Sequence, residues 1–265
     1  MLILETDSLS RSYGELIAVN ALTFSIEAGE VFGLLGPNGA GKTTTMKMLT
    51  TLLPPTSGKA YVGGFDVARQ SASVRRVIGY VPQMISADGT LTGYENLIIF
   101  AKLYDLPRSE REDRVRSALA FMGLAEAADK LVREYSGGMI RRLEIAQSML
   151  HRPPLLFLDE PTVGLDPNAH RIVWDHIEQL RKEYGITILL TTHLMEEADS
   201  LCDRVAIMHL GDIVASGTPN QLKAGIGGNG STLDDVFIHY TGNQMESGGS
   251  FRETTRTRRT ARRLG

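Results

Sequence analysis

The sequence of 265 residues contains one cysteine, one tryptophan and no long apolar run. The single thiol, that of Cys202, excludes an intrachain disulfide framework and supplies no metal cluster, which is typical of a reducing compartment. A membrane-spanning helix needs about 20 consecutive apolar residues, and neither such a stretch nor a signal peptide is recognisable. We therefore expect a chain that does not cross a membrane.

The composition is that of an ordinary globular protein, with 42% apolar and 22% charged residues. A chain of this length can bury one large α/β core, or a core with a smaller lobe. The net charge of −3 is unevenly distributed, because residues 246–265 contain six arginines and two glutamates. The composition beyond Thr241 predicts a basic disordered tail. Contact of this tail with anionic lipid head groups is an alternative interpretation.

Strand patterns dominate the beginning of the sequence. Residues 2–4 and 17–26 are strand-like and precede a continuous apolar run at 31–35. This order predicts an N-terminal antiparallel β subdomain beside a core strand. From residue 88 the pattern becomes helical, which predicts a helical subdomain, about 84–150, inserted in the core.

Residues typical of helix starts and ends predict limits of two helices. Within the helical subdomain, Ser109 and Glu112 have the spacing of a capping box, which predicts a helix start at this point. A later helix is predicted with Asp166 as its N-cap and Gly185 just past its end.

The second half of the core is predicted from its apolar strands. Residues 155–159 form a continuous apolar run of the kind found in parallel sheets. Further strands are expected at 186–191 and 204–209, with a tight hairpin turn at 210–213. Together with the preceding patterns, these strands predict an α/β fold with a mixed sheet.

A glycine-rich stretch directly after the strand at 31–35 matches the phosphate-binding P-loop pattern G-x-x-x-x-G-K-[ST]. It consists of Gly36, Pro37, Asn38, Gly39, Ala40, Gly41, Lys42 and Thr43. Glycines let backbone N–H groups converge on phosphate oxygens, and the following helix N-terminus adds partial positive charge. Lys42 supplies a full positive charge, and the hydroxyl of Thr43 is suited to bind Mg²⁺. A glycine-rich turn without a ligand is the alternative.

Two adjacent carboxylates, Asp159 and Glu160, end the apolar strand at 155–159. The carboxyl edge of a parallel sheet is where ligands bind, beside the P-loop. There Asp159 can hold Mg²⁺ together with Thr43, while Glu160 orients and deprotonates the water that attacks the terminal phosphate. An acidic pair that merely caps the next turn is the alternative.

A second anion-binding helix start is predicted at Ser136, Gly137 and Gly138. Serine at an N-cap followed by two glycines leaves free N–H groups and room for a phosphate. An ordinary capped helix start explains the same residues. The acidic strand that follows favours the phosphate interpretation.

The order of these motifs resembles that of the ATP-binding subunits of ABC transporters, over roughly residues 2–217. The resemblance includes the P-loop with Thr44, Gln83 as the Q-loop residue, the signature Ser136-Gly137-Gly138, the Walker B Asp159, the catalytic Glu160, the D-loop Gly164-Leu165-Asp166 and the switch His193. Tyr13 lies where the family has an adenine-stacking aromatic. Alternatives from the residues alone are a polar turn for Gln83, a core histidine for His193 and ordinary packing for Tyr13.

The resemblance implies a P-loop NTPase core that binds ATP and Mg²⁺. The nucleotide would contact Tyr13, the P-loop and the signature residues. Thr43, Gln83 and Asp159 would form the metal site, and Glu160, His193 and Gln83 would be catalytic. One ATPase domain would span residues 1–224, followed at 225–265 by a linker, a last short helix at 233–240 and the tail.

The resemblance also implies partners and a location. Two such subunits close head to tail around two ATP molecules, and a separate ABC-2-type membrane permease holds them at the cytoplasmic face of the cell membrane. The association with the membrane would be indirect, and no nucleic acid is expected. Export of a drug, lipid or other hydrophobic small molecule is the implied function.

The branch indicated is that of drug-resistance exporters of the daunorubicin type, supported by the segment 91–97. The chain departs from the usual family pattern at Tyr135, Met139 and 163–164. An importer subunit, or a soluble ABC ATPase that acts on nucleic acid or ribosomes, remains an alternative. A simple P-loop GTPase or kinase leaves the signature residues and His193 unexplained.

Overall fold

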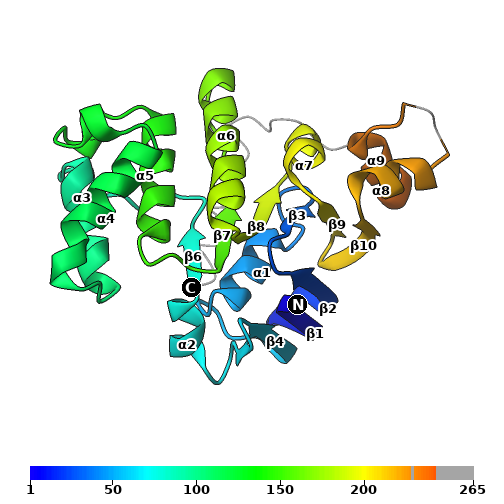
Figure 1. Ribbon diagram of the computed structural model, residues 1–265. Helices are drawn as coiled ribbons and strands as arrows, with labels where there is room; N and C mark the ends of the chain where they lie inside the picture. The colour runs from blue at the N-terminus through cyan, green and yellow to red at the C-terminus, as the bar shows by residue number, and fades with distance from the viewer. Residues whose placement is uncertain (228–229, 243–265) are drawn as a thin grey trace.

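The computed structural model describes residues 1–227 and 230–242, and Figure 1 shows two sheets and a group of helices to one side. The first sheet is antiparallel with the order β2-β1-β4-β5. Its strands are β1 (Leu2–Tyr13), β2 (Leu16–Glu27), β4 (Ser57–Val62) and β5 (Phe65–Asp66). The predicted antiparallel β subdomain is confirmed.

The second sheet has six strands in the order β10-β9-β3-β8-β7-β6. These are β10 (Asp212–Gly217), β9 (Arg204–His209), β3 (Val31–Leu35), β8 (Thr187–Thr192), β7 (Leu155–Asp159) and β6 (Ile78–Val81). Only β10 runs antiparallel to its neighbour, across a two-residue turn at Leu210 and Gly211. The strands β3, β7 and β8 are buried along their whole length, because helices or the first sheet cover both faces. The α/β fold with a mixed sheet is confirmed.

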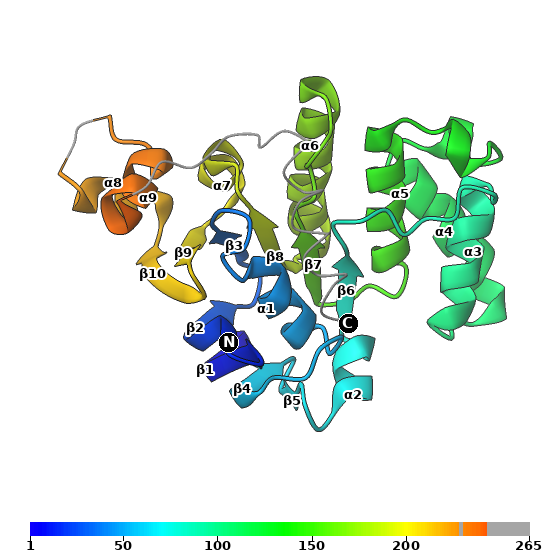
Figure 2. The same cartoon turned by 180° about the vertical axis from the view of Figure 1, so that it is seen from behind.

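The helix α1 (Lys42–Leu49) lies between the two sheets (Figures 1 and 2). Its buried side chains Met46 and Leu49 join one apolar cluster with Leu4 of the first sheet and Phe157 of the second. On the opposite face of the six-stranded sheet a second cluster is formed with α6 (Pro167–Tyr184) and α7 (Met195–Leu201). The P-loop is therefore anchored between two apolar cores.

The helical lobe lies beside β6 and α6 (Figure 1). It contains α3 (Gly93–Leu103), α4 (Arg108–Phe121), two short 3₁₀ turns (Ala125–Ala127 and Val132–Glu134) and α5 (Gly137–Met149). Its apolar side chains belong to the same cluster as those of α6 and α7. The lobe is thus packed onto the core.

The predicted capping box of Ser109 and Glu112 is wrong. The helix α4 begins two residues earlier, with Pro107 rather than Ser109 at the N-cap position, and no side chain caps it. Glu112 instead accepts hydrogen bonds from Arg116 one turn later. A capping box is present at the start of α3, where Thr92 and Glu95 satisfy each other's backbone N–H groups.

The predicted limits of α6 are confirmed, because the Asp166 side chain accepts from two backbone N–H groups and Gly185 adopts a left-handed conformation with φ 62°. Three short helices were not predicted: α2 (Ser71–Arg76), α7 and α8 (Pro219–Gly225). The predicted last helix is present as α9 (Leu233–Thr241) and packs on α7, α8 and β10. The division of the chain at residue 224 stays a prediction.

The predicted basic tail lies outside the described residues. Within residues 1–227 and 230–242, no helix is both long enough and apolar enough to cross a membrane.

Candidate active site

The P-loop connects the buried strand β3 to α1 and adopts backbone conformations that favour glycine. Gly39 and Gly41 have φ of 87° and 107°. A Cβ atom on Gly41 would lie 2.5 Å from the carbonyl oxygen of Ala18, so a larger residue does not fit there. Gly41 offers no side chain to cap α1, and this leaves the first N–H groups of the helix for an anionic ligand.

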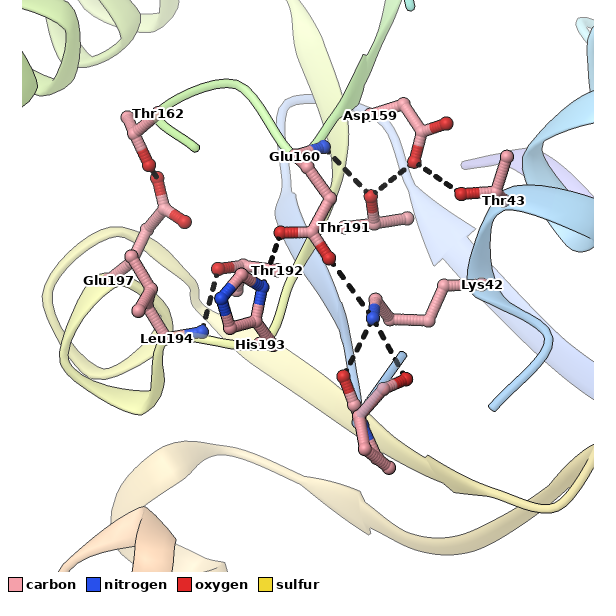
Figure 3. Close-up of polar contacts among 12 residues, drawn as sticks. Lys42, Thr43, Asp159, Glu160, Thr162, Thr191, Thr192, His193, Leu194 and Glu197 are labelled. Carbon is pink, nitrogen blue, oxygen red and sulfur yellow. Dashed lines mark hydrogen bonds and ion pairs between the residues drawn. The ribbon is translucent and has the colours of Figure 1, made fainter. Parts of the chain in front are cut away.

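Lys42 and His193 hold Glu160 from two sides (Figure 3). Lys42 Nζ lies 3.0 Å from Glu160 Oε1, and the two side chains are only 5% and 3% exposed. His193 Nδ1 lies 2.8 Å from Glu160 Oε2. Lys42 also donates to the carbonyl oxygens of Gly36 at 2.6 Å and Pro37 at 3.2 Å. The P-loop lysine, the acidic strand end and the switch histidine therefore form one cluster.

The two neighbouring carboxylates differ in their protonation energetics. Burial raises the pKa of Glu160, but the hydrogen bonds and positive charge of His193 and Lys42 together outweigh it, so the pKa lies below its usual value. Burial also raises the pKa of Asp159, and there the hydrogen bonds from Thr191 and Thr43 do not offset it. Glu160 is consequently the carboxylate that is ionised more readily.

The Asp159 carboxylate lies beside the Thr43 hydroxyl, and one of its two oxygens has no hydrogen-bond partner among the described residues. Its Oδ1 accepts from Thr191 Oγ1 at 2.7 Å and Thr43 Oγ1 at 3.2 Å. Its Oδ2 is buried and has no hydrogen-bond partner among the described residues. A carboxylate oxygen and a hydroxyl are oxygen ligands that Mg²⁺ accepts. The residues present therefore fit the ion.

Gln83 follows β6 at the same edge of the sheet as Asp159, because β6 pairs in parallel with β7. The Gln83 side chain is exposed, while its carbonyl oxygen accepts from Arg141 Nη2 at 3.0 Å. The strand order thus brings Gln83 to the carboxyl edge where the P-loop lies. Its role toward Mg²⁺ or water stays a prediction.

The signature residues begin α5 of the helical lobe, whereas the P-loop precedes α1 between the two sheets (Figure 1). Ser136 is the N-cap of α5, and its Oγ accepts from the Met139 N–H at 3.3 Å. Ser136 and Gly137 are exposed, whereas a Cβ atom on Gly138 would lie 2.8 Å from Ala169 of α6. The structure records no direct hydrogen bond or ion pair between Ser136 and Lys42, the two predicted phosphate-binding residues, among the residues it describes.

Tyr13 ends β1 and is 46% exposed, with the Arg11 guanidinium 4.7 Å from its ring centre. It belongs to the hairpin of β1 and β2, which also carries the Ala18 carbonyl that touches the P-loop. The aromatic ring is therefore accessible on an element next to the P-loop. Stacking on adenine stays a prediction.

The roles of Thr191 and Glu197 were missed from the sequence. Thr191 Oγ1 donates to Asp159 and accepts from the Glu160 N–H at 3.0 Å, so it orients the Asp159 carboxylate and the backbone of Glu160. The fully buried Glu197 accepts from Thr162 Oγ1 and Trp174 Nε1, both at 2.9 Å. The position of Thr191 at the end of a buried strand was a usable signal. No signal distinguished Glu197 from its exposed neighbour Glu196.

The P-loop, its buried lysine and the acidic end of the parallel strand β7, which β8 separates from β3 in the sheet, define a P-loop nucleoside triphosphatase. The chain belongs to the ABC transporter family, whose model matches residues 19–163. As a member of this family it is an ATP-binding protein and an ATPase.

Relatives of known name agree with this assignment. The chain is 41% identical over 227 residues to the linearmycin resistance ATP-binding protein LnrL of Bacillus subtilis (strain 168), covering 86% of this chain and 73% of that one. It is 45% identical over 226 residues to the daunorubicin/doxorubicin resistance ATP-binding protein DrrA of Streptomyces peucetius, covering 85% and 68%. The resemblance to the drug-resistance branch is confirmed.

Solved structures share the fold. A structure described as the ATP-binding subunit of an ABC transporter superimposes with a TM-score of 0.80 at 32% identity, covering 90% of this chain and 99% of that one. The ADP conformation of MJ1267, an ATP-binding cassette of an ABC transporter, gives a TM-score of 0.73 at 25% identity, covering 83% and 92%.

Proposed function

We propose that this chain powers the export of a drug, lipid or other hydrophobic small molecule through a separate membrane permease of the ABC-2 type. The contact of Glu160 with Lys42 and His193 carries the catalytic part of the proposal. The names of the relatives, which are resistance proteins for linearmycin and for daunorubicin or doxorubicin, support the direction and the class of cargo.

The catalytic carboxylate in this proposal is Glu160. Its pKa lies below the usual value while Lys42 and His193 contact it, so the carboxylate is ionised at neutral pH and can accept the proton of the attacking water once Lys42 has left it. When the terminal phosphate recruits Lys42, the lysine leaves Glu160, while His193 keeps the carboxylate in place at Oε2. This exchange of partners couples the arrival of ATP to the release of the base.

The magnesium site would consist of Thr43, Asp159 and Gln83. Bound there, the ion would neutralise charge on the phosphate oxygens. Thr191 would hold Asp159 in orientation through its 2.7 Å hydrogen bond. Gln83 lies at the same sheet edge, where its amide would orient the ion's ligands or the attacking water.

The active assembly would be a head-to-tail pair of these chains. Ser136 and Gly137 are exposed at the start of α5 and make no hydrogen bond or ion pair with Lys42 among the described residues. A second subunit would present these groups to the terminal phosphate held by Lys42 of the first. The pair would be attached to the permease at the cytoplasmic face of the cell membrane, without contact to nucleic acid.

Three experiments test the proposal. The purified protein is expected to hydrolyse ATP, and Glu160→Gln is expected to lose this activity. The control variant Glu178→Gln, at an exposed ion pair on α6, should retain it.

Co-purification from membranes is expected to recover a permease, and inside-out vesicles with both proteins should accumulate a hydrophobic drug on addition of ATP. Undiminished turnover in Glu160→Gln would refute the catalytic role, and recovery with an extracellular binding protein would indicate import instead.

A further inference from the structure

The loop that carries Gln83 faces a buried ion pair on α5. Arg141 Nη1 lies 3.0 Å from Glu144 Oε2, and the two side chains are 6% and 1% exposed. Burying two charges removes them from water, so such a pair is retained only where other polar groups complete its hydrogen bonds. The groups that do so here belong to the loop after β6.

Both charges bind the backbone of this loop. Arg141 donates from Nη1 to the carbonyl oxygen of Pro82 at 2.7 Å and from Nη2 to that of Gln83 at 3.0 Å. Glu144 Oε1 accepts from the Ser86 N–H and from the Ser86 hydroxyl, the latter at 2.9 Å. The loop is thus fastened at both ends to one turn of α5.

The residues between these anchors contribute little packing. Met84 and Ile85 are 77% and 62% exposed, so their side chains do not define the position of the loop. Hydrogen bonds to the two buried charges remain as the interactions that fix it. The planar guanidinium is suited to bind two neighbouring carbonyl oxygens at once, because its N–H groups form a rigid fork.

The same helix connects the loop with both halves of the candidate site. α5 starts at Ser136, and its Arg141 is close enough to Asp159 for that carboxylate to raise the pKa of the guanidinium against the lowering caused by burial. The Gln83 loop leaves β6 beside the strand that ends at Asp159. A movement of α5 would therefore shift the Gln83 backbone, which Arg141 binds, relative to Asp159.

We propose that Arg141 and Glu144 are a positioning pair that holds the Gln83 loop on α5, so that Gln83 reaches the active site only in the orientation set by this helix. The inference rests on the proposed ATPase function and adds a specific pair of residues to it. The pair does not contact substrate. It acts through the carbonyl of Gln83 and the N–H of Ser86.

The test uses a variant that removes both charges, Arg141→Gln with Glu144→Ala. Removal of one partner alone would leave a buried charge unpaired and destabilise the chain, which would confuse the result. The matched control is Glu112→Ala with Arg116→Gln, an ion pair of the same lobe in which both side chains are 64% exposed. Circular dichroism and thermal unfolding establish that each variant is folded.

Hydrogen exchange on the full chain without added nucleotide provides the first readout. The amide of Ser86 should exchange about tenfold faster in the double variant, because its acceptor is removed and the loop opens locally. The control variant should match the wild type. Unchanged exchange at Ser86 in the folded double variant would overturn the proposal, whatever the activity.

ATP hydrolysis provides the second readout. kcat should fall about ten- to a hundredfold, as expected when a reacting group is misplaced by about 1 Å. KM for ATP should stay within about twofold if it reports binding, since the P-loop and Lys42 are untouched. The kcat of Arg141→Lys, which keeps the positive charge but not the planar guanidinium, should lie between the values of the wild type and the double variant.

A folded double variant whose kcat equals that of the wild type would overturn the proposal. A folded double variant whose KM rises by the same factor as its kcat falls would also overturn it. A wild type without any ATPase activity would refute the proposed function, and the exchange rate of Ser86 would still decide whether the loop is clamped.

Discussion

Neutralising Glu160 is expected to tighten the binding of ATP as well as to stop its hydrolysis. Lys42 and Glu160 are almost fully buried and lie 3.0 Å apart. ATP must draw Lys42 away from this carboxylate before the lysine can bind phosphate. Glu160→Gln keeps the shape of the side chain and removes the competing charge.

The size of the effect follows from this contact. At 3.0 Å the Coulomb energy of the pair is about 5.5 kcal/mol with an effective dielectric constant of about 20. Because ATP replaces one anionic partner of Lys42 with another, the smaller net value of a charge-assisted hydrogen bond, about 1.5–3 kcal/mol, is the better measure. At about 1.4 kcal/mol per factor of ten, the Kd for ATP should fall about ten- to a hundredfold.

The assay must separate this effect from dimer formation, which also raises the apparent affinity. ATP binding is therefore measured by calorimetry in a Ser136→Glu background, where the added charge repels the phosphate of a facing subunit. Glu30→Gln is the control, because Glu30 is also buried and ion-paired, with Arg204 at 3.0 Å, but has no contact with Lys42. An affinity in Glu160→Gln equal to or weaker than that of its parent would refute the competition between Glu160 and phosphate for Lys42.

Three further predictions follow from the structure. Ser136→Ala should lower ATP hydrolysis and leave the ATP affinity of the monomer unchanged, as measured by steady-state kinetics and calorimetry; a large loss of monomer affinity would place Ser136 in the site of its own chain. Burial raises the pKa of Glu197 above its usual 4.5, so the cost of ionising it is absent below pH 4.5 and grows as the pH rises. Glu197→Gln should accordingly have a higher Tm than wild type at pH 7, by about 2–4 °C per kcal/mol, and a smaller difference at pH 4; an advantage that grows on acidification would contradict this. Phe157→Ala, in the fully buried strand β7, should lower the free energy of unfolding by about 3–5 kcal/mol in urea titrations, because it leaves a cavity in the core. A loss below about 1 kcal/mol would contradict this and would show that the core around β7 collapses onto the cavity.

The sequence predicted the elements whose pattern has a single physical explanation. The continuous apolar runs at β3 and β7 are at most five residues long, and a glycine-rich stretch or an acidic residue follows each run, which favours a buried strand over a helix; both strands were located correctly. Short helices such as α2 and α7 have six and seven residues, too few for a helical period to stand out. The Ser109 capping box failed because α4 already begins at Arg108 and Ser109 lies inside its first turn, whereas Thr92 occupies the N-cap position of α3.

The candidate site was predicted as a set of residues but not as a set of contacts. The parallel order of β6, β7, β8 and β3 brings their carboxyl ends to one edge, which follows from a fold class that the sequence indicates. The contact of Lys42 with Glu160 was not predictable, because an isolated P-loop lysine is expected to face phosphate. The clamp on the Gln83 loop was hidden for another reason: Arg141 and Glu144 look like a surface i,i+3 pair until the burial of α5 is known.

The neighbouring carboxylates at the end of β7 receive different roles from their surroundings alone. Glu160 already has two cationic or hydrogen-bonding partners, and its pKa is lowered. Asp159 has two hydroxyl donors on one oxygen, none on the other, and a raised pKa. A bound cation stabilises an ionised carboxylate most where no other cation already contacts it, and this favours Asp159 as the magnesium ligand. In the proposed mechanism the same difference would leave Glu160 free to act as a base once phosphate has taken Lys42, so a division of labour between the two adjacent acids would need no difference in their distance from the P-loop.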